Sequence, residues 1–203
     1  MSKKPVPARS VDLNRAARAI EEFLRAIGAP IDTDPELVGT GERVASAFAE
    51  DLLCGYDMDE AEILTEGVAS RAQGLVVVTN LATATLCPHH LLPATGLAHV
   101  GYLPGERVVG LGALGSLVDC FSRRLALQED IAANVADALI QHLGARGAAV
   151  VVDLAPTCMT VRGDRRHDAR ATATAFRGVF ETDESQRLAF LRALPHAAAA
   201  SSD

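Results

Sequence analysis

The feature that most constrains the fold is a hydrophobic period that changes repeatedly between residues 75 and 176. Short stretches that are β-branched or that alternate between apolar and polar residues indicate strands, whereas apolar residues three or four apart indicate helices. The strand-like segments are 75–80, 96–103, 148–154 and 170–176, and the helical segments are 114–125 and 131–143. This order predicts an α+β domain with helices packed on one face of a largely antiparallel sheet.

Both flanks of this region carry helical patterns. Apolar residues recur at helical spacing over 11–27, where Gly28 follows, and again over 40–52. Near the other end, Asp183 is a candidate N-cap of a last helix that runs through Leu194. We therefore expect helices before and after the sheet.

The chain is expected to form one compact unit, because 49% of its residues are apolar and 22% are charged. Within it we expect an N-terminal helical region over 11–70 and a catalytic domain over 71–195. The terminal stretches 1–10 and 196–203 hold little that could be buried, so both are expected to be loose and disordered.

Charge and hydropathy exclude two classes of partner. The formal net charge is −7 and basic residues are interspersed with acidic ones, so no basic face for nucleic acid is expected. No apolar run reaches the roughly 18 residues of a membrane span, and the start MSKKPVPARS lacks the apolar core of a secretory signal. We expect a cytoplasmic protein whose four scattered cysteines are free thiols or metal ligands.

The segment Leu86-Cys87-Pro88-His89-His90 contains a candidate metal site. A thiolate and an imidazole three residues apart in a turn can reach one ion together, although such a pair also occurs by chance. Cys158 follows the buried strand 148–154 and is a candidate third ligand. Two sulfurs and one nitrogen leave one tetrahedral position open, which is typical of a catalytic zinc ion rather than a structural one.

Three motifs extend this site into a family resemblance. The sequence contains CPHHLLPATGLAHVGYLPGERVVGL, then FSRRLALQED, then CMTVRG, and with this order and spacing it resembles the GTP cyclohydrolase I family over about residues 40–180. The resemblance implies the tunnelling fold, assembled into a homo-oligomeric barrel, a decamer or other toroidal assembly, with active sites at subunit interfaces. It also implies hydrolysis of a cyclic amidine C–N bond, in which the guanine ring opens at C8, loses formate and recloses to dihydroneopterin triphosphate.

The resemblance also implies roles for individual residues. Cys87, His90 and Cys158 match the zinc ligands, and His89 matches the histidine that works on the purine ring. Gln128 and Glu129 match the pair that reads the guanine edge, and Arg162 and Arg43 match arginines around the phosphates. Without the family, Glu129 is a first-turn helix acid, His89 is an exposed loop histidine and the arginines are surface charges. Cys54 and Cys120 match no functional position and are interpreted as small buried hydrophobes.

The sequence departs from the family pattern in three places. Pro156 stands where members carry a histidine that transfers protons, so another group, such as His167 or a water, would have to substitute. Pro88 stands where glutamate is common. Gly112, Ala113 and Ser116 stand where members carry a hydroxyl and two cations, and each lost charge-assisted contact would remove about 1.5–3 kcal/mol of triphosphate binding.

These departures lead to a hypothesis and its alternatives. The preferred one is a divergent zinc enzyme that acts at C8 of a guanine-type purine carrying fewer phosphates: a monophosphate, a nucleoside or the free base. The alternatives are the ordinary conversion of GTP and a catalytically inactive zinc-binding oligomeric paralogue. The nitrile reductase that shares the tunnelling fold is disfavoured, because the CPHH loop is present and no nicotinamide-binding signature is found.

Overall fold

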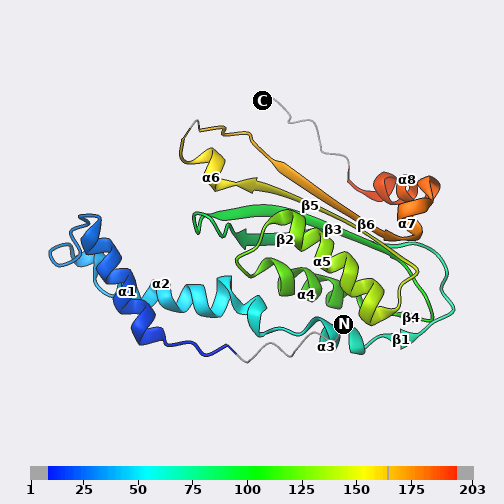
Figure 1. Cartoon of the computed structure of the whole chain (residues 1–203), viewed down its shortest axis with the longest axis horizontal. Coiled ribbons are helices and arrows are strands. Elements are labelled where there is room, and N and C mark those ends of the chain that lie inside the picture. Colours follow the sequence, from blue (N-terminus) through cyan, green and yellow to red (C-terminus); the bar gives the residue numbers. More distant parts are fainter. Residues whose placement is uncertain (1–8, 164, 196–203) are drawn as a thin grey trace.

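A computed structural model describes residues 9–163 and 165–195 (Figure 1). The expected loose ends, apart from residues 9 and 10, lie outside the described residues. The helices are α1 (Leu13–Ala26), α2 (Thr40–Ser46), α3 (Glu60–Thr65), α4 (Leu111–Ser122), α5 (Gln128–Ala138), α6 (Thr157–Thr160), α7 (Val179–Thr182) and α8 (Glu184–Ala193). Shorter 3₁₀ or π-helical turns are η1 (Pro35–Leu37), η2 (Ala47–Leu52), η3 (Cys54–Asp57) and η4 (Leu139–Leu143). The strands are β1 (Val68–Ala69), β2 (Val76–Leu86), β3 (Pro93–Leu103), β4 (Arg107–Val108), β5 (Gly147–Pro156) and β6 (Ala171–Gly178).

The centre of the fold is a four-stranded sheet with the order β2-β3-β5-β6, and all its neighbouring strands are antiparallel. This confirms the predicted mixture of helices and antiparallel sheet. Helices α4 and α5 cover one face (Figure 1). Alternate strand residues such as Val100, Val150 and Val152 are fully buried there, packed with Leu117 and Val135 from the two helices. This layer is the main hydrophobic core.

The opposite face of the sheet is also partly covered, so the prediction of helices on one face only is wrong. Phe180 of α7 and Phe190 of α8 are fully buried in a second cluster with Val151. The two rings meet edge to face, with centroids 6.2 Å apart. Gly101 lies under Phe190, where an added Cβ would come within 2.6 Å of the ring. The sequence pattern shows which residues are apolar but not that α8 folds back over the sheet.

Strand β2 continues well past the predicted segment 75–80. The hydrogen-bonding register with β3 shifts between Val78 and Leu81, and Asn80 adopts a positive φ of 59° in this bulge. The N–H of Asn80 donates to Nδ1 of the buried His99, at 3.2 Å. Asparagine is common in turns, so the sequence pattern predicted that the strand ends at Asn80. Instead, the strand continues after the bulge, and its pairing with β3 extends to Leu86.

The two N-terminal helices form at the predicted places. Asp12 caps α1 by accepting a hydrogen bond from the N–H of Arg15, and α2 continues into the wider turns of η2. Helix α1 packs on α2 where Gly41 lies against the backbone of Ala17. The apolar side of α1 is only partly buried within this chain: Ala17 is buried and Leu24 is half-buried, whereas Phe23 is 59% exposed. No helix in the described part of the chain is both long and apolar enough to cross a membrane.

Candidate metal centre

The β2-β3 hairpin loop carries the first two candidate ligands. The loop is closed by two backbone hydrogen bonds: the N–H of Cys87 donates to the carbonyl oxygen of Leu92, and the N–H of Leu91 donates to that of Cys87. Leu91 has a positive φ of 55°, an uncommon conformation for a non-glycine residue that costs free energy. The loop thus turns within a few residues and keeps Cys87 and His90 on the same short segment.

The third candidate ligand comes from a different hairpin. Strand β5 pairs with β3, and Ala94 at the start of β3 lies opposite Pro156 at the end of β5. Thr157 then donates from its hydroxyl to the carbonyl oxygen of Pro93 at 2.5 Å, where the chain turns into the four-residue helix α6. This places Cys158 beside the loop of Cys87 and His90.

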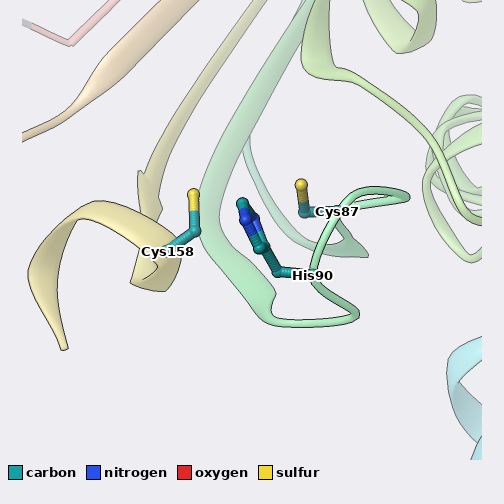
Figure 2. Close-up of side chains that lie close together, drawn as sticks. All are labelled: Cys87, His90 and Cys158. Carbon is teal, nitrogen blue, oxygen red and sulfur yellow. The ribbon is translucent and has the colours of Figure 1, made fainter. Parts of the chain in front are cut away.

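The three side chains converge (Figure 2). One ring nitrogen of His90 and the sulfurs of Cys87 and Cys158 all lie within 4.8 Å of one another. In the view of Figure 2 the imidazole stands between the two thiols. Both cysteines are half-buried and His90 is exposed.

This geometry suits a small, soft divalent ion. With Zn–S bonds of about 2.3 Å, tetrahedral coordination would separate the two sulfurs by about 3.8 Å, which is within the observed limit. A set of two sulfurs and one imidazole nitrogen is typical of zinc and poorly suited to magnesium or calcium, which prefer oxygen ligands. The group could therefore hold a zinc ion after small side-chain adjustments.

His89 lies next to this group without belonging to it. Its ring Nδ1 is 3.8 Å from the sulfur of Cys87, and its ring meets that of His90 at 71° with centroids 6.4 Å apart. The His89 side chain is exposed. It is therefore positioned to contact a molecule that reaches the metal group from solvent.

The N-terminus of α5 is held against the end of β2. Leu86 forms an isolated bridge with Leu125, and the N–H of Ala126 donates to the carbonyl oxygen of Leu86. Gln128 and Glu129, the first two residues of α5, follow directly. The Oε1 atom of Gln128 is buried without a hydrogen-bond partner among the described residues, and Glu129 is exposed. The structure thus brings the predicted base-reading pair to the strand end that leads into Cys87.

The remaining predicted site residues are not joined to the metal group by any contact within the described part of the chain. Arg43 donates to the carbonyl oxygen of Val38 at 2.8 Å and to the hydroxyl of Thr40 at 2.9 Å, so it stabilises the turn before α2. Arg162 and His167 are exposed in the segment between α6 and β6.

The other two cysteines, Cys54 and Cys120, do not belong to the metal group. Cys120 is fully buried, burial raises the pKa of its thiol, and its sulfur accepts a hydrogen bond from Arg124. Cys54 is half-buried and donates to the carbonyl oxygen of Asp51. The predicted buried character is confirmed for Cys120, whereas Cys54 keeps some exposure.

Ala113 and Ser116, two of the positions that depart from the family pattern, line an acidic hollow that the sequence did not predict. Its volume is about 390 Å³, and it lies between η3, α3 and α4. Four carboxylates line it: Asp57, Asp59, Glu62 and Glu66. The four-residue spacing of the two glutamates was visible in the sequence, but nothing there placed them beside α4.

Known proteins match this chain over most of its length. The sequence profile of the family described as GTP cyclohydrolase I matches residues 16–195. A protein of Chromobacterium violaceum named "GTP cyclohydrolase 1" is 41% identical over 187 residues, which cover 92% of this chain and 90% of that protein. Proteins of the same name from Ralstonia nicotianae and Rhodopirellula baltica are each 38% identical, covering 92% and 96% of this chain and 88% and 84% of their own lengths.

One solved structure shows a weaker likeness. The apo form of the archaeosine synthase QueF-Like overlaps 53% of this chain and 97% of its own, at 17% identity and a TM-score of 0.44. This overlap is too low to carry a conclusion.

Proposed function

The chain belongs to the GTP cyclohydrolase I family, and from this premise we propose that it is a zinc-dependent hydrolase that opens the five-membered ring of GTP at C8. The products are formate and, after reclosure, dihydroneopterin triphosphate. The relatives named "GTP cyclohydrolase 1" match more than nine-tenths of this chain, which favours GTP as the substrate.

One observation carries the proposal: three ligand atoms from two separate hairpins lie within 4.8 Å of one another. A bound zinc ion would supply Lewis acidity for the addition of water at C8. The chain itself supplies the ligands Cys87, His90 and Cys158.

Other side chains would orient the substrate and move protons. His89 is exposed and its Nδ1 is 3.8 Å from the sulfur of Cys87, so it can give or take a proton on a purine held against the metal group. The exposed carboxylate of Glu129 can accept two hydrogen bonds from guanine N–H groups, and the buried, unpartnered Oε1 of Gln128 can accept one after its side chain rotates toward the base. Adenine lacks those donors, so this pair would select guanine.

We also propose that the active protein is a homo-oligomer. Large apolar side chains are exposed on the elements that surround the metal group. They are Leu91, Leu125, Leu127, Met159 and Val161. Such a patch is typical of a protein interface, and its burial by a second copy would also cover the candidate site from solvent. Light scattering of the purified protein would measure the subunit number, and a monomeric mass would refute this part of the proposal.

A second candidate substrate is a guanine compound with fewer phosphates, and the acidic hollow favours it. Two positions where the family resemblance implies cations, Ala113 and Ser116, line a space with four carboxylates. A triphosphate placed there would meet like charge instead of cations, whereas guanosine would not.

One experiment separates the two candidates. Zinc-loaded protein is incubated with GTP, GMP, guanosine and guanine in turn, and ring opening, formate and pterin fluorescence are followed. Neopterin formation from GTP at micromolar concentration supports the ordinary reaction. Turnover of GMP or guanosine with little turnover of GTP supports the second candidate. No turnover of any of them, with zinc bound, refutes both and favours an inactive zinc-binding protein.

A charge-restoring variant tests the role of the hollow. Ala113→Lys combined with Ser116→Arg should raise kcat/KM for GTP relative to guanosine by at least tenfold if the hollow receives phosphates. Leu111→Lys is the matched control, because Leu111 lies on the same helix, is 62% exposed and does not line the hollow. An equal effect of both variants would indicate general electrostatic attraction instead of a phosphate site.

A further inference from the structure

The turn between α4 and α5 is fastened to the end of β2. Leu125 in this turn forms an isolated parallel bridge with Leu86, and the N–H of Ala126 donates to the carbonyl oxygen of Leu86 at 3.2 Å. The hydroxyl of Thr85 donates to the carbonyl oxygen of Arg124 at 3.2 Å and, more weakly, to that of Ala126 at 3.4 Å. Thr85 is 4% exposed, so its hydroxyl has little access to water and depends on the turn for hydrogen bonds.

The same turn is held by η3 through a second set of contacts. The hydroxyl of Tyr56 accepts a hydrogen bond from the N–H of Leu125 at 3.2 Å. The guanidinium of Arg124 lies over the Tyr56 ring, 5.7 Å from its centroid, and its Nε donates to the carbonyl oxygen of Gly55 at 3.0 Å. A Cβ added at Gly55 would come within 2.7 Å of the carbonyl oxygen of Arg123, so η3 packs directly on the backbone of the turn. Tyr56 is therefore fixed in contact with it.

These contacts connect two parts of the candidate site. Leu86 directly precedes the ligand Cys87, and the turn leads into Gln128 and Glu129 at the start of α5. A purine is rigid, so a metal group that acts at C8 and a carboxylate that reads the opposite end of the base must keep a fixed separation. The end of β2 carries the first of these parts and the start of α5 carries the second. The fastened turn therefore sets the separation between them.

We propose that Thr85 and Tyr56 are positioning residues that set the selectivity of the site for guanine. Both act through the turn, whose far end presents Glu129, and neither has to touch the substrate. Without the Thr85 hydroxyl the turn loses its side-chain anchor on β2, and Glu129 is no longer held at the separation that a guanine requires. The zinc content should stay the same, because Thr85 is not one of the ligands. This inference rests on the proposed function and deepens it by naming residues that govern the choice of base.

Thr85→Val is the main test, because it removes the hydroxyl and keeps the branched shape of the side chain. Thr83→Val is the matched control. Thr83 lies on the same strand and is also 4% exposed, but its hydroxyl donates to the carbonyl oxygen of Leu81 in that strand, at 2.9 Å, and not to the turn. Thr85→Ser keeps the hydroxyl and should therefore keep the selectivity.

The readout is the dissociation constant of inosine triphosphate divided by that of GTP, since the two nucleotides differ only in the 2-amino group that Glu129 would read. Both are measured by calorimetry on zinc-loaded protein that also carries His89→Ala, so that little ligand is consumed. We expect Thr85→Val to lower this ratio by about five- to tenfold, as for a weakened hydrogen bond to a charged group. Thr83→Val and Thr85→Ser should leave it within about twofold. If the protein prefers GMP to GTP, the two monophosphates replace the triphosphates.

Tyr56→Phe gives a second test that does not depend on a core substitution. Tyr56 is 38% exposed and loses only its hydroxyl, so this variant should fold even if Thr85→Val does not. It should lower the same ratio by about two- to fivefold, because one exposed hydrogen bond to the turn is lost. A merely structural role of either residue would weaken the binding of both nucleotides equally and leave the ratio unchanged.

Two results would overturn the positioning roles while the proposed function stands. One is an unchanged ratio in Thr85→Val and Tyr56→Phe, and the other is an equal fall in Thr83→Val, which would assign the effect to any hydroxyl lost from β2. In both cases the unmodified protein still binds guanine nucleotides. If the zinc-loaded protein without these substitutions binds neither GTP nor GMP, the proposed function fails and this inference fails with it, so the two failures are distinguishable.

Discussion

Gly96→Ala is expected to damage the fold and the metal centre together. Gly96 lies in β3 opposite Leu154 of β5, two residues along each strand from the pair Ala94 and Pro156. A Cβ added at Gly96 would lie 2.1 Å from the carbonyl oxygen of Asp153 and 3.0 Å from the Cα of Leu154. Real Cβ atoms essentially never approach below 3.0 Å, so the two strands would have to separate locally by about 0.9 Å.

The magnitude follows from two contributions. Forcing an extra carbon into a closely packed site costs about 1–3 kcal/mol, and each weakened strand hydrogen bond costs about 1 kcal/mol. The free energy of unfolding should fall by about 3 kcal/mol, which for a chain of this length lowers the thermal midpoint by about 6–12 °C. Because Cys158 follows β5 directly, the displacement should also lower zinc affinity, by about tenfold or more.

Calorimetry of the metal-free protein measures the first effect, and competition with a chromophoric zinc chelator measures the second. Gly112→Ala is the matched control: an added Cβ there meets nothing within 4 Å, and the site lies inside α4. That substitution should raise the free energy of unfolding by up to about 1 kcal/mol. The reasoning is refuted if Gly96→Ala stays within about 0.5 kcal/mol of the unmodified protein and keeps its zinc affinity.

Four other substitutions have distinct expected outcomes. His89→Ala should lower turnover by about 100-fold or more with metal content unchanged. Cys158→Ala should lose metal on elemental analysis, because Cys158 belongs to the ligand group and His89 does not. Burial lowers the pKa of His99 below its ordinary 6.5, so the unfolded chain binds the proton first as pH falls. In urea unfolding the stability of the unmodified protein relative to His99→Gln should therefore decrease below about pH 6.5, and parallel pH profiles would contradict this. Arg107→Met should cost about 2–3 kcal/mol by the same assay, because its guanidinium donates to four backbone carbonyl oxygens around α3 and η4.

Local patterns predicted the elements better than their limits. Asp183 caps α8 as expected, because a capping carboxylate acts on the N–H groups of the next two or three residues and is visible without tertiary context. The end of β2 was missed at Asn80, since a bulge depends on the partner strand and on His99. The position of α8 was missed because an apolar residue such as Phe190 indicates that it is buried, but not which part of the protein it packs against.

The candidate site divides in the same way. The ligands Cys87 and His90 could be predicted from the sequence, because two residues three positions apart in a turn necessarily lie close together. The structure adds the support that spacing cannot show: the closed loop with Leu91 at positive φ, and the bridge from Leu86 to Leu125 that holds the N-terminus of α5 in place.

The sequence by itself determined the type of most of the longer strands and helices, which residues are competent metal ligands, and which family the motifs resemble. These depend on periodicity and on short-range spacing, which are properties of neighbouring residues. Only the tertiary structure decided that Cys158 reaches Cys87, because the register of β3 on β5 sets that meeting, and that Glu62 and Glu66 share a hollow with α4. A hydrophobic pattern specifies that a face is buried, but the distant segment that covers it is selected by packing of the whole chain.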